Sequence, residues 1–267
     1  MNPAEKEIKL RAFAASVINH SEYREEIDYL LKALELTVEQ AIQSYVNYDM
    51  NIFSYENEIY ESLSMRMTLH LHYLLPESWH QDRQLAVLEA IKKINPSTTV
   101  DMGFGAPTRY IREFILLNKK VLLLTDLYPS AFIFSQALFN FLSKNWKSFI
   151  SFKQLDMNEH PYPGDFDLYI FQDSIEHVRD STEYLNELVK KSPSSSKFIF
   201  SLPIGPRIPL HTISWDAEQD AITWLEKANL QIIDKKRVFV NPEVDLFADQ
   251  FEKKFYNLIV SCQKNPP

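Results

Sequence analysis

The chain has 267 residues, of which 45% are hydrophobic, and this composition allows a sizeable core and excludes general disorder. Acidic residues outnumber basic ones by 36 to 28, so the net charge of -8 disfavours a nucleic-acid partner, whose phosphates would be repelled. The single cysteine excludes a disulfide framework, and the lack of a long apolar run near the N-terminus predicts a cytoplasmic protein with no membrane partner.

Residues 1–95 have the apolar spacing of α-helices. Apolar side chains recur there at steps of three and four, which is the spacing of one helix face, and no strand pattern interrupts them. The clearest faces are formed by Ile27, Leu30, Leu31 and Leu34, and then by Leu63, Met67, Leu71 and Leu74. Pro96 follows the last helical pattern. We therefore predict an all-α N-terminal subdomain that ends at residue 95.

Several side chains of this helical segment have roles that the sequence leaves open. The segment is rich in aromatic side chains, which form either a lid over the active site or a face for packing or dimerisation. They are Tyr45, Tyr48, Phe53, Tyr55 and Tyr60. The spacing of His70 and His72 does not place both on one helix face, so these residues and His80 are predicted to flank the core. A segment just before the first strand commonly lies across the edge of the sheet at which a cofactor binds. Arg66, Tyr73 and Trp79 are therefore candidates for lining a cofactor pocket.

Residues 96–267 alternate short apolar runs with longer amphipathic ones, the pattern of βαβ units. The predicted strands are Thr98–Met102, Val121–Asp126, Phe149–Leu155, Phe166–Phe171, Lys197–Leu202, Gln231–Lys235 and Phe255–Cys262. The predicted helices are Thr108–Leu117, Ser130–Ser143, Ser181–Lys191 and Asp216–Ala228. We therefore expect an α/β domain with a doubly wound, seven-stranded, mostly parallel sheet, which binds ligands at the carboxyl ends of its strands.

A glycine turn follows the first predicted strand. The segment Asp101-Met-Gly-Phe-Gly105 contains two of the 4 glycines in the chain, so the backbone is free to curve beneath a ligand. A Gly-x-Gly pair also occurs in ordinary tight turns. A nicotinamide-dependent dehydrogenase would have a third glycine where Thr108 stands and an apolar residue in place of Asp101, which argues against that alternative.

Acidic residues follow the next two strands. Asp126 ends the second strand, where a doubly wound fold places an acid that accepts hydrogen bonds from ribose hydroxyls. Asp156 and Met157 follow the third strand and suit the amino group and the ring face of an adenine. Each acid alone could equally cap a helix or a turn. Their order along one edge of the sheet favours a nucleoside site.

A polar cluster follows the fourth strand, in the segment from Gln172 to His177. On a helix, Asp173, Glu176 and His177 would share one face, because they are three and four positions apart. Together with His211, these side chains offer ligands for Mg²⁺, Mn²⁺, Fe²⁺ or Zn²⁺. The same residues serve equally well to shape a pocket and cap a helix, and we expect no metal.

Taken together, these features resemble class I S-adenosylmethionine-dependent methyltransferases over roughly residues 97–262. The segment Asp101-Met-Gly-Phe-Gly105 is similar to the family's first motif, and Ile175-Glu-His-Val178 is similar to the Glu-His-Val that often follows its fourth strand. The cofactor-binding residues that the resemblance implies are Asp101, Gly103, Gly105, Asp126, Leu127, Asp156, Met157 and Gln172. The sequence departs from the family at Pro107, which stands where a third glycine is common and stiffens the turn.

The resemblance implies transfer of a methyl group from S-adenosylmethionine to an oxygen or nitrogen of a small-molecule acceptor. Displacement at a sulfonium requires alignment in a dry site more than a strong base. If the acceptor must lose a proton, the catalytic candidates are Asp173, His177 and His211. Two alternatives stay open, transfer of the aminobutyl group of the same cofactor, as in nicotianamine-type synthases, and a non-catalytic cofactor-binding module. The expected assembly is a monomer or a homodimer.

Overall fold

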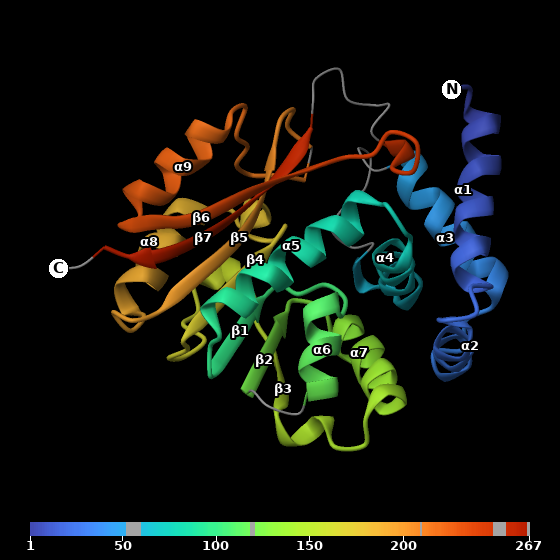
Figure 1. Cartoon of the computed structure of the whole chain (residues 1–267), viewed down its shortest axis with the longest axis horizontal. Helices are drawn as coiled ribbons and strands as arrows, with labels where there is room; N and C mark the ends of the chain where they lie inside the picture. Colours follow the sequence, from blue (N-terminus) through green and yellow to red (C-terminus); the bar gives the residue numbers. More distant parts are fainter. Residues whose placement is uncertain (52–59, 118–120, 209, 248–254, 266–267) are drawn as a thin grey trace.

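The computed structural model describes residues 1–51, 60–117, 121–208, 210–247 and 255–265. A seven-stranded sheet at its centre has the strand order β3-β2-β1-β4-β5-β7-β6 (Figure 1). Neighbouring strands are parallel from β3 to β5, whereas β7 runs antiparallel to both β5 and β6. The expected doubly wound, mostly parallel sheet is therefore confirmed.

The elements of the α/β part fall close to their predicted positions. Its strands are β1 (Thr98–Met102), β2 (Val121–Asp126), β3 (Ile150–Gln154), β4 (Leu168–Gln172), β5 (Lys197–Ile204), β6 (Leu230–Phe239) and β7 (Tyr256–Lys264). Its helices are α6 (Arg109–Leu117), α7 (Pro129–Leu142), α8 (Ser181–Lys191) and α9 (Glu218–Lys227). Between β3 and β4 the chain forms only a 3₁₀ turn, Met157–Glu159.

The largest difference from the predicted bounds is in β6, which was expected to end at Lys235 and instead continues to Phe239. This strand is at the edge of the sheet, and most of its second half is exposed. The charged side chains Lys235, Lys236 and Arg237 suit an exposed edge, because they discourage pairing with another chain. Their polarity also removes the apolar alternation by which a strand is recognised in sequence.

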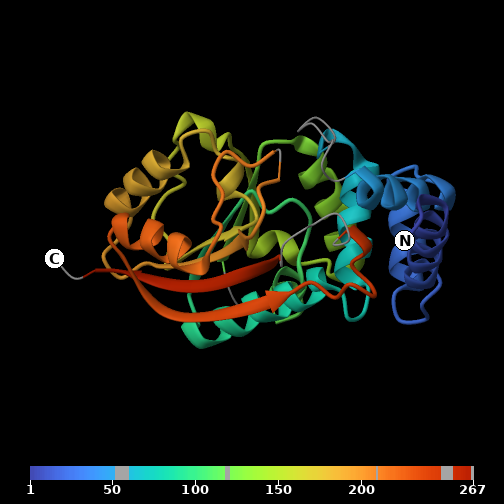
Figure 2. The same ribbon diagram turned by 90° about the horizontal axis from the view of Figure 1, so that it is seen from above.

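Helices cover both faces of the sheet, and the alternation of side chains along each strand divides the core in two (Figure 2). One face packs against α5 (Trp79–Ile94), α6 and α7 and includes Leu122, Leu124, Ile170 and Ile199. The other face packs against α8 and α9 and includes Val100, Tyr169, Phe171, Phe198 and Phe200. The central strands are therefore buried on both sides, and the carboxyl edge of the sheet is the part that is free to form a ligand site.

Most of the N-terminal helices lie at one end of the sheet, whereas the last of them, α5, lies across one of its faces (Figures 1 and 2). They are α1 (Pro3–Ile18), α2 (Arg24–Ala33), α3 (Val38–Asn51), α4 (Leu63–Leu74) and α5 (Trp79–Ile94). Ser78 caps the start of α5 by accepting a hydrogen bond from the backbone of Gln81, and Asn95 ends the helix in a left-handed conformation. Although α5 precedes the predicted boundary at residue 95, it packs against β5, β6 and β7. None of the described helices has the length and apolar character needed to span a bilayer.

A buried ion-pair cluster joins the N-terminal helices to the α/β part. Glu26 of α2 accepts hydrogen bonds from Arg112 of α6 at 2.6 and 2.7 Å and contacts Nε2 of His70 at 2.8 Å. Glu26 is 3% exposed and His70 is 1% exposed. His72, by contrast, stacks on Tyr45 with ring centroids 4.1 Å apart. The two histidines thus have different partners, as their spacing predicts. Together with His80 they are buried within the core, whereas they were predicted to flank it.

Candidate functional site

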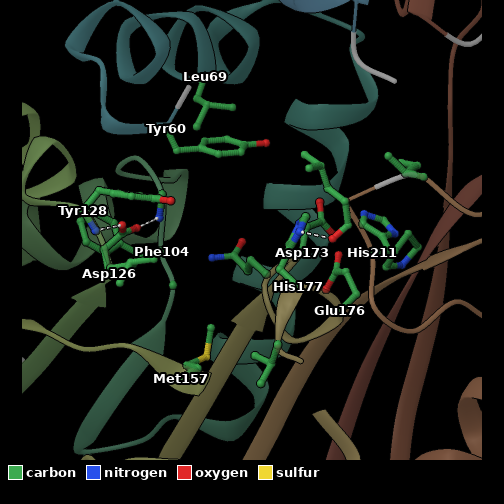
Figure 3. A pocket seen from close by; sticks show the side chains of 18 of the residues that line it. Tyr60, Leu69, Phe104, Asp126, Tyr128, Met157, Asp173, Glu176, His177 and His211 are labelled. Atoms are coloured by element: carbon green, nitrogen blue, oxygen red, sulfur yellow. Dashed lines mark hydrogen bonds between the residues drawn. The ribbon is translucent and has the colours of Figure 1, made fainter. Parts of the chain in front are cut away.

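A cavity of about 250 Å³ lies at the carboxyl ends of β1, β2 and β4. Its two ends are visible in Figure 3, with Asp126 at one and Glu176 at the other. The loops that follow the strands form one wall of the cavity. The predicted site residues that line it are Gly103, Gly105, Asp126, Leu127, Asp156, Met157, Gln172, Asp173, Glu176, His177 and His211. The structure therefore gathers every predicted site residue around one cavity except Asp101, which lies behind its wall.

The turn after β1 brings the backbone close to the cavity and to the loop after β4. Gly103 and Gly105 have φ values of 73° and 66°, in the left-handed region that favours glycine. A Cβ atom added to Gly103 would lie 3.0 Å from Cβ of Ser174 and 3.2 Å from Cε of Met157. Glycine is needed at position 103 for both its backbone conformation and this close approach.

Asp126 is 6% exposed and is held by three donors. Its Oδ1 accepts hydrogen bonds from the backbone of Tyr128 at 2.9 Å and from Nη2 of Arg66 at 3.2 Å, and its Oδ2 accepts one from the backbone of Gly105 at 3.0 Å. A carboxylate has about four acceptor sites, so these contacts leave one for a ligand, and a second if Arg66 moves. Burial raises the pKa of Asp126, which the Arg66 guanidinium partly offsets.

Asp101 is fully buried one layer behind the cavity. Its Oδ2 accepts hydrogen bonds from the hydroxyl of Tyr110 and, at 3.2 Å, from Nε2 of Gln172. Burial raises the pKa of Asp101 to about 7. Gln172 itself lines the cavity. The structure thus connects the first acid of the glycine motif to the cavity through Gln172.

Leu127, Asp156 and Met157 line the cavity near Asp126. The carboxylate of Asp156 also caps a turn, because it accepts hydrogen bonds from the backbone and side-chain nitrogens of Asn158 at 2.8 and 3.0 Å. Leu127 is 39% exposed, which is high for an apolar side chain at the edge of a core. This end of the cavity therefore combines apolar surface with carboxylate oxygens.

The carboxylate of Asp173 is engaged by side chains other than Glu176, His177 and His211. Its backbone has a φ of 47°, and its carboxylate pairs with the guanidinium of Arg83 and accepts hydrogen bonds from Ser201 at 2.9 Å and from Asn257. The helical face on which Asp173, Glu176 and His177 were expected to align does not form. The left-handed residue breaks the segment, and a short 3₁₀ turn, Ile175–His177, replaces the helix.

Glu176, His177 and His211 form a compact group at the opposite end of the cavity from Asp126 (Figure 3). One ligand atom from each lies within 4.8 Å of the others, and the two imidazole rings meet edge to face with centroids 4.9 Å apart. Glu176 is fully buried, and neither of its carboxylate oxygens has a hydrogen-bond partner among the described residues. An unpaired buried carboxyl group is costly, so this group requires an explanation.

The same burial controls the charges of this group. It raises the pKa of Glu176 to about 8 and lowers the pKa of His177 to about 4 and that of His211 to about 3. All three side chains are therefore uncharged at neutral pH when nothing else is bound. Perturbed titratable groups that converge in a cavity are typical of functional sites.

The helical segment supplies the opposite wall of the cavity. Arg66, Tyr73 and Trp79 line it as expected, and of the proposed lid aromatics Tyr48 and Tyr60 line it as well. Tyr45 is fully buried in the core instead. Phe53 and Tyr55 are outside the described residues. The segment is therefore part of the site.

Sequence reasoning did not identify the two arginine contacts that organise the site. Arg66 pairs with Asp126 across 60 positions in the chain, and Arg83 pairs with Asp173. Both guanidinium groups are almost completely buried, at 1% and 4% exposure. An arginine in a helix gives no local signal of a distant acidic partner, so these pairs become visible only once the helices are placed over the sheet.

No family model matches the chain, and no curated protein matches it. Solved structures do resemble it. The N-methyltransferase NodS from Bradyrhizobium japonicum WM9, in complex with S-adenosylhomocysteine, matches 79% of this chain and 100% of its own at 14% identity, with a TM-score of 0.57. The [4+2]-cyclase SpnF matches 72% of this chain and 84% of its own at 11% identity, also with a TM-score of 0.57.

A third similar structure is the magnesium protoporphyrin IX methyltransferase ChlM from Synechocystis PCC 6803 with bound S-adenosylhomocysteine. It matches 70% of this chain and 84% of its own at 12% identity, with a TM-score of 0.50. Identities this low establish a common fold and leave the reaction open. The chain has the Rossmann-like fold of class I S-adenosylmethionine-dependent methyltransferases, preceded by a helical N-terminal region.

Proposed function

We propose that the chain is an S-adenosylmethionine-dependent methyltransferase that acts on an oxygen or nitrogen nucleophile of a small molecule. The observation that carries this proposal is the convergence of Asp126, Asp156 and Gln172, which follow three different strands, on one cavity beneath a glycine turn. The cavity also has a separate polar end, at Glu176, for an acceptor. In open α/β sheets, ligands bind at this edge.

In this proposal the nucleoside lies at the Asp126 end. The ribose hydroxyls donate to the carboxylate of Asp126, and the adenine ring lies against Leu127 and Met157, with Asp156 near its amino group. The methionine portion follows the glycine turn. Arg66 also lines the cavity and donates to the carbonyl oxygen of Gly105 at 2.8 Å, so its guanidinium is well placed to bind the methionine carboxylate.

Methyl transfer then requires alignment and exclusion of water. A lone pair of the acceptor forms a bond to the methyl carbon while the carbon–sulfur bond breaks, and its electrons leave the sulfur neutral in S-adenosylhomocysteine. A proton lost by the acceptor passes to Asp173, His177 or His211, or to water. The two imidazoles are uncharged at neutral pH and offer a lone pair to the proton, and their burial, which lowers both pKa values, makes them weak bases. The aromatic wall formed with Tyr48, Tyr60 and Tyr73 supports the proposal because it limits solvent access.

One observation favours a second candidate function. A [4+2]-cyclase shares this fold at the same TM-score as an N-methyltransferase. The fold by itself is therefore compatible with a cofactor-binding protein that catalyses no methyl transfer.

We expect the purified chain to bind S-adenosylmethionine and to release S-adenosylhomocysteine when it is offered phenols, alcohols, carboxylic acids and amines in separate mixtures. Mass spectrometry of the nucleoside products distinguishes the alternatives. Release of methylthioadenosine would indicate aminobutyl transfer. Saturable binding with no nucleoside product in any mixture would contradict methyl transfer to these acceptors and favour a binding module.

A further inference from the structure

We propose that Glu176, His177 and His211 form a binding site for one divalent transition-metal ion. Two imidazoles and one carboxylate are a common ligand set for Zn²⁺ and Fe²⁺. Three such atoms around one ion are about 3 to 3.5 Å apart, given metal–ligand distances of about 2.0 to 2.2 Å. In this structure they lie within 4.8 Å of one another, so side-chain rotations that bring them about 1 to 2 Å closer would complete the site.

The environment of Glu176 points to a cation. Its side chain is fully buried, and both carboxylate oxygens are without hydrogen-bond partners among the residues that the structure describes. The neighbouring imidazoles each have a nitrogen that can supply a lone pair. An ion held by all three groups would offset the cost of this unpaired carboxyl group, which has no hydrogen bond from another described residue.

The backbone around the group is already fixed. Nδ1 of His177 lies 3.2 Å from the carbonyl oxygen of Leu210, and because a carbonyl only accepts, this nitrogen carries the proton. Nε2 of His177 is then the atom with a free lone pair. A backbone carbonyl bound to the other ring nitrogen is the usual support of a metal-binding histidine.

Thr212 ties the two parts of the group together. Its backbone nitrogen and its hydroxyl donate to the carbonyl oxygen of Glu176 at 2.7 and 3.0 Å. Arg207 donates to the carbonyl oxygen of His211 at 3.0 Å. The loop after β5, which carries His211, is therefore fastened to the 3₁₀ turn after β4. This arrangement places the three ligands before any ion binds.

Asp173 is not part of the proposed site, although it is close in sequence. Its carboxylate is engaged by Arg83, Ser201 and Asn257. The site therefore has three protein ligands, and all three residues line the cavity. Imidazole ligands favour Zn²⁺, Co²⁺, Fe²⁺ or Mn²⁺ over Ca²⁺ and Mg²⁺, which prefer all-oxygen sites. An imidazole that binds the ion is not available as a base.

This site can be tested without any methyl donor. The full chain is first treated with a chelator and then titrated with Co²⁺, whose binding is monitored by visible absorption. Zn²⁺ is then added to displace the bound Co²⁺. We expect one equivalent to bind. Glu176→Gln, which keeps the size of the side chain, and His211→Ala should each weaken binding about tenfold or more. The matched control is His160→Ala. Among the described residues, His160, Glu183 and Glu187 form the other group with metal-ligand spacing, and this group is partly exposed.

A measurement on the unmodified chain tests the same site even if the variants do not fold. X-ray absorption spectroscopy of the Co²⁺ complex should detect two imidazole ligands. The proposal is contradicted if Co²⁺ does not bind saturably, if fewer than two imidazoles are bound, or if His160→Ala removes the binding and Glu176→Gln does not. Because no methyl donor is present, each of these results is independent of whether the chain transfers methyl groups.

Discussion

The Asp126→Asn variant is expected to bind S-adenosylmethionine about 10- to 100-fold more weakly than the unmodified chain. Asparagine keeps the shape of the side chain but removes the charge, so at least one charge-assisted hydrogen bond to a ribose hydroxyl is lost. Such a bond contributes about 1.5 to 3 kcal/mol, and each 1.4 kcal/mol corresponds to a tenfold change in affinity. Isothermal titration calorimetry measures the difference directly.

The control for this experiment follows from the buried contact between Asp126 and Arg66. Removing the carboxylate leaves a guanidinium that is 1% exposed without its acidic partner, so Asp126→Asn is also expected to lower the free energy of unfolding by about 3 to 5 kcal/mol. A double variant, Arg66→Met with Asp126→Asn, removes both charges and should recover much of this stability. The double variant is compared for stability only, because Arg66 is itself proposed to bind the cofactor. If Asp126→Asn loses stability but keeps its affinity for the cofactor, Asp126 does not bind the ribose in the way proposed.

The Glu26→Gln variant is expected to show the largest loss of stability among single changes in the N-terminal helices, about 3 kcal/mol or more. Burial alone would raise the pKa of Glu26, but His70 and Arg112 lower it from 4.5 to about 2. The charged carboxylate therefore stabilises the fold fully above about pH 4.5, and this contribution is lost as the pH falls towards 2. Urea unfolding at a series of pH values should show this decline in the unmodified chain and a smaller one in the variant.

An exposed ion pair provides the comparison for Glu26. Glu39 accepts a hydrogen bond from Arg11 at 3.0 Å, but its side chain is 70% exposed. Ion pairs of this kind contribute about 0 to 1 kcal/mol, so Glu39→Gln should change the free energy of unfolding little. Equal losses in the two variants would show that the buried cluster does not hold the N-terminal helices against α6.

Much of the fold follows from local patterns in the sequence. The bounds of β1 and β2 were predicted to the residue, because Pro96 and the glycine turn bound β1 and because β2 is an apolar run. The edge strand β6 was predicted four residues short at its exposed end, since Lys235 was taken as the last residue instead of Phe239, and solvent replaces a packed neighbour there. Continuous apolar runs report burial on both faces of a sheet, so they identify central strands better than edge strands.

The residues of the candidate site that directly follow strands were predicted from the sequence. Their contacts with residues that are distant in the sequence were not. Asp126, Asp156 and Gln172 lie around one cavity because parallel strands deliver their carboxyl ends to one edge. The path of the chain at Asp173 could not be predicted, since its left-handed backbone and its contacts with Arg83 and Asn257 depend on α5 and β7. Contacts between residues that are distant in the sequence cannot be predicted from local sequence patterns.

A crystal structure of the chain with S-adenosylhomocysteine provides the most direct test of the site. We expect the ribose hydroxyls within hydrogen-bond distance of Asp126, the adenine between Leu127 and Met157, and the sulfur directed towards the end of the cavity that contains Glu176. A nucleoside bound at another surface, or a ligand that leaves Asp126 with only its present partners Arg66, Gly105 and Tyr128, would contradict the account.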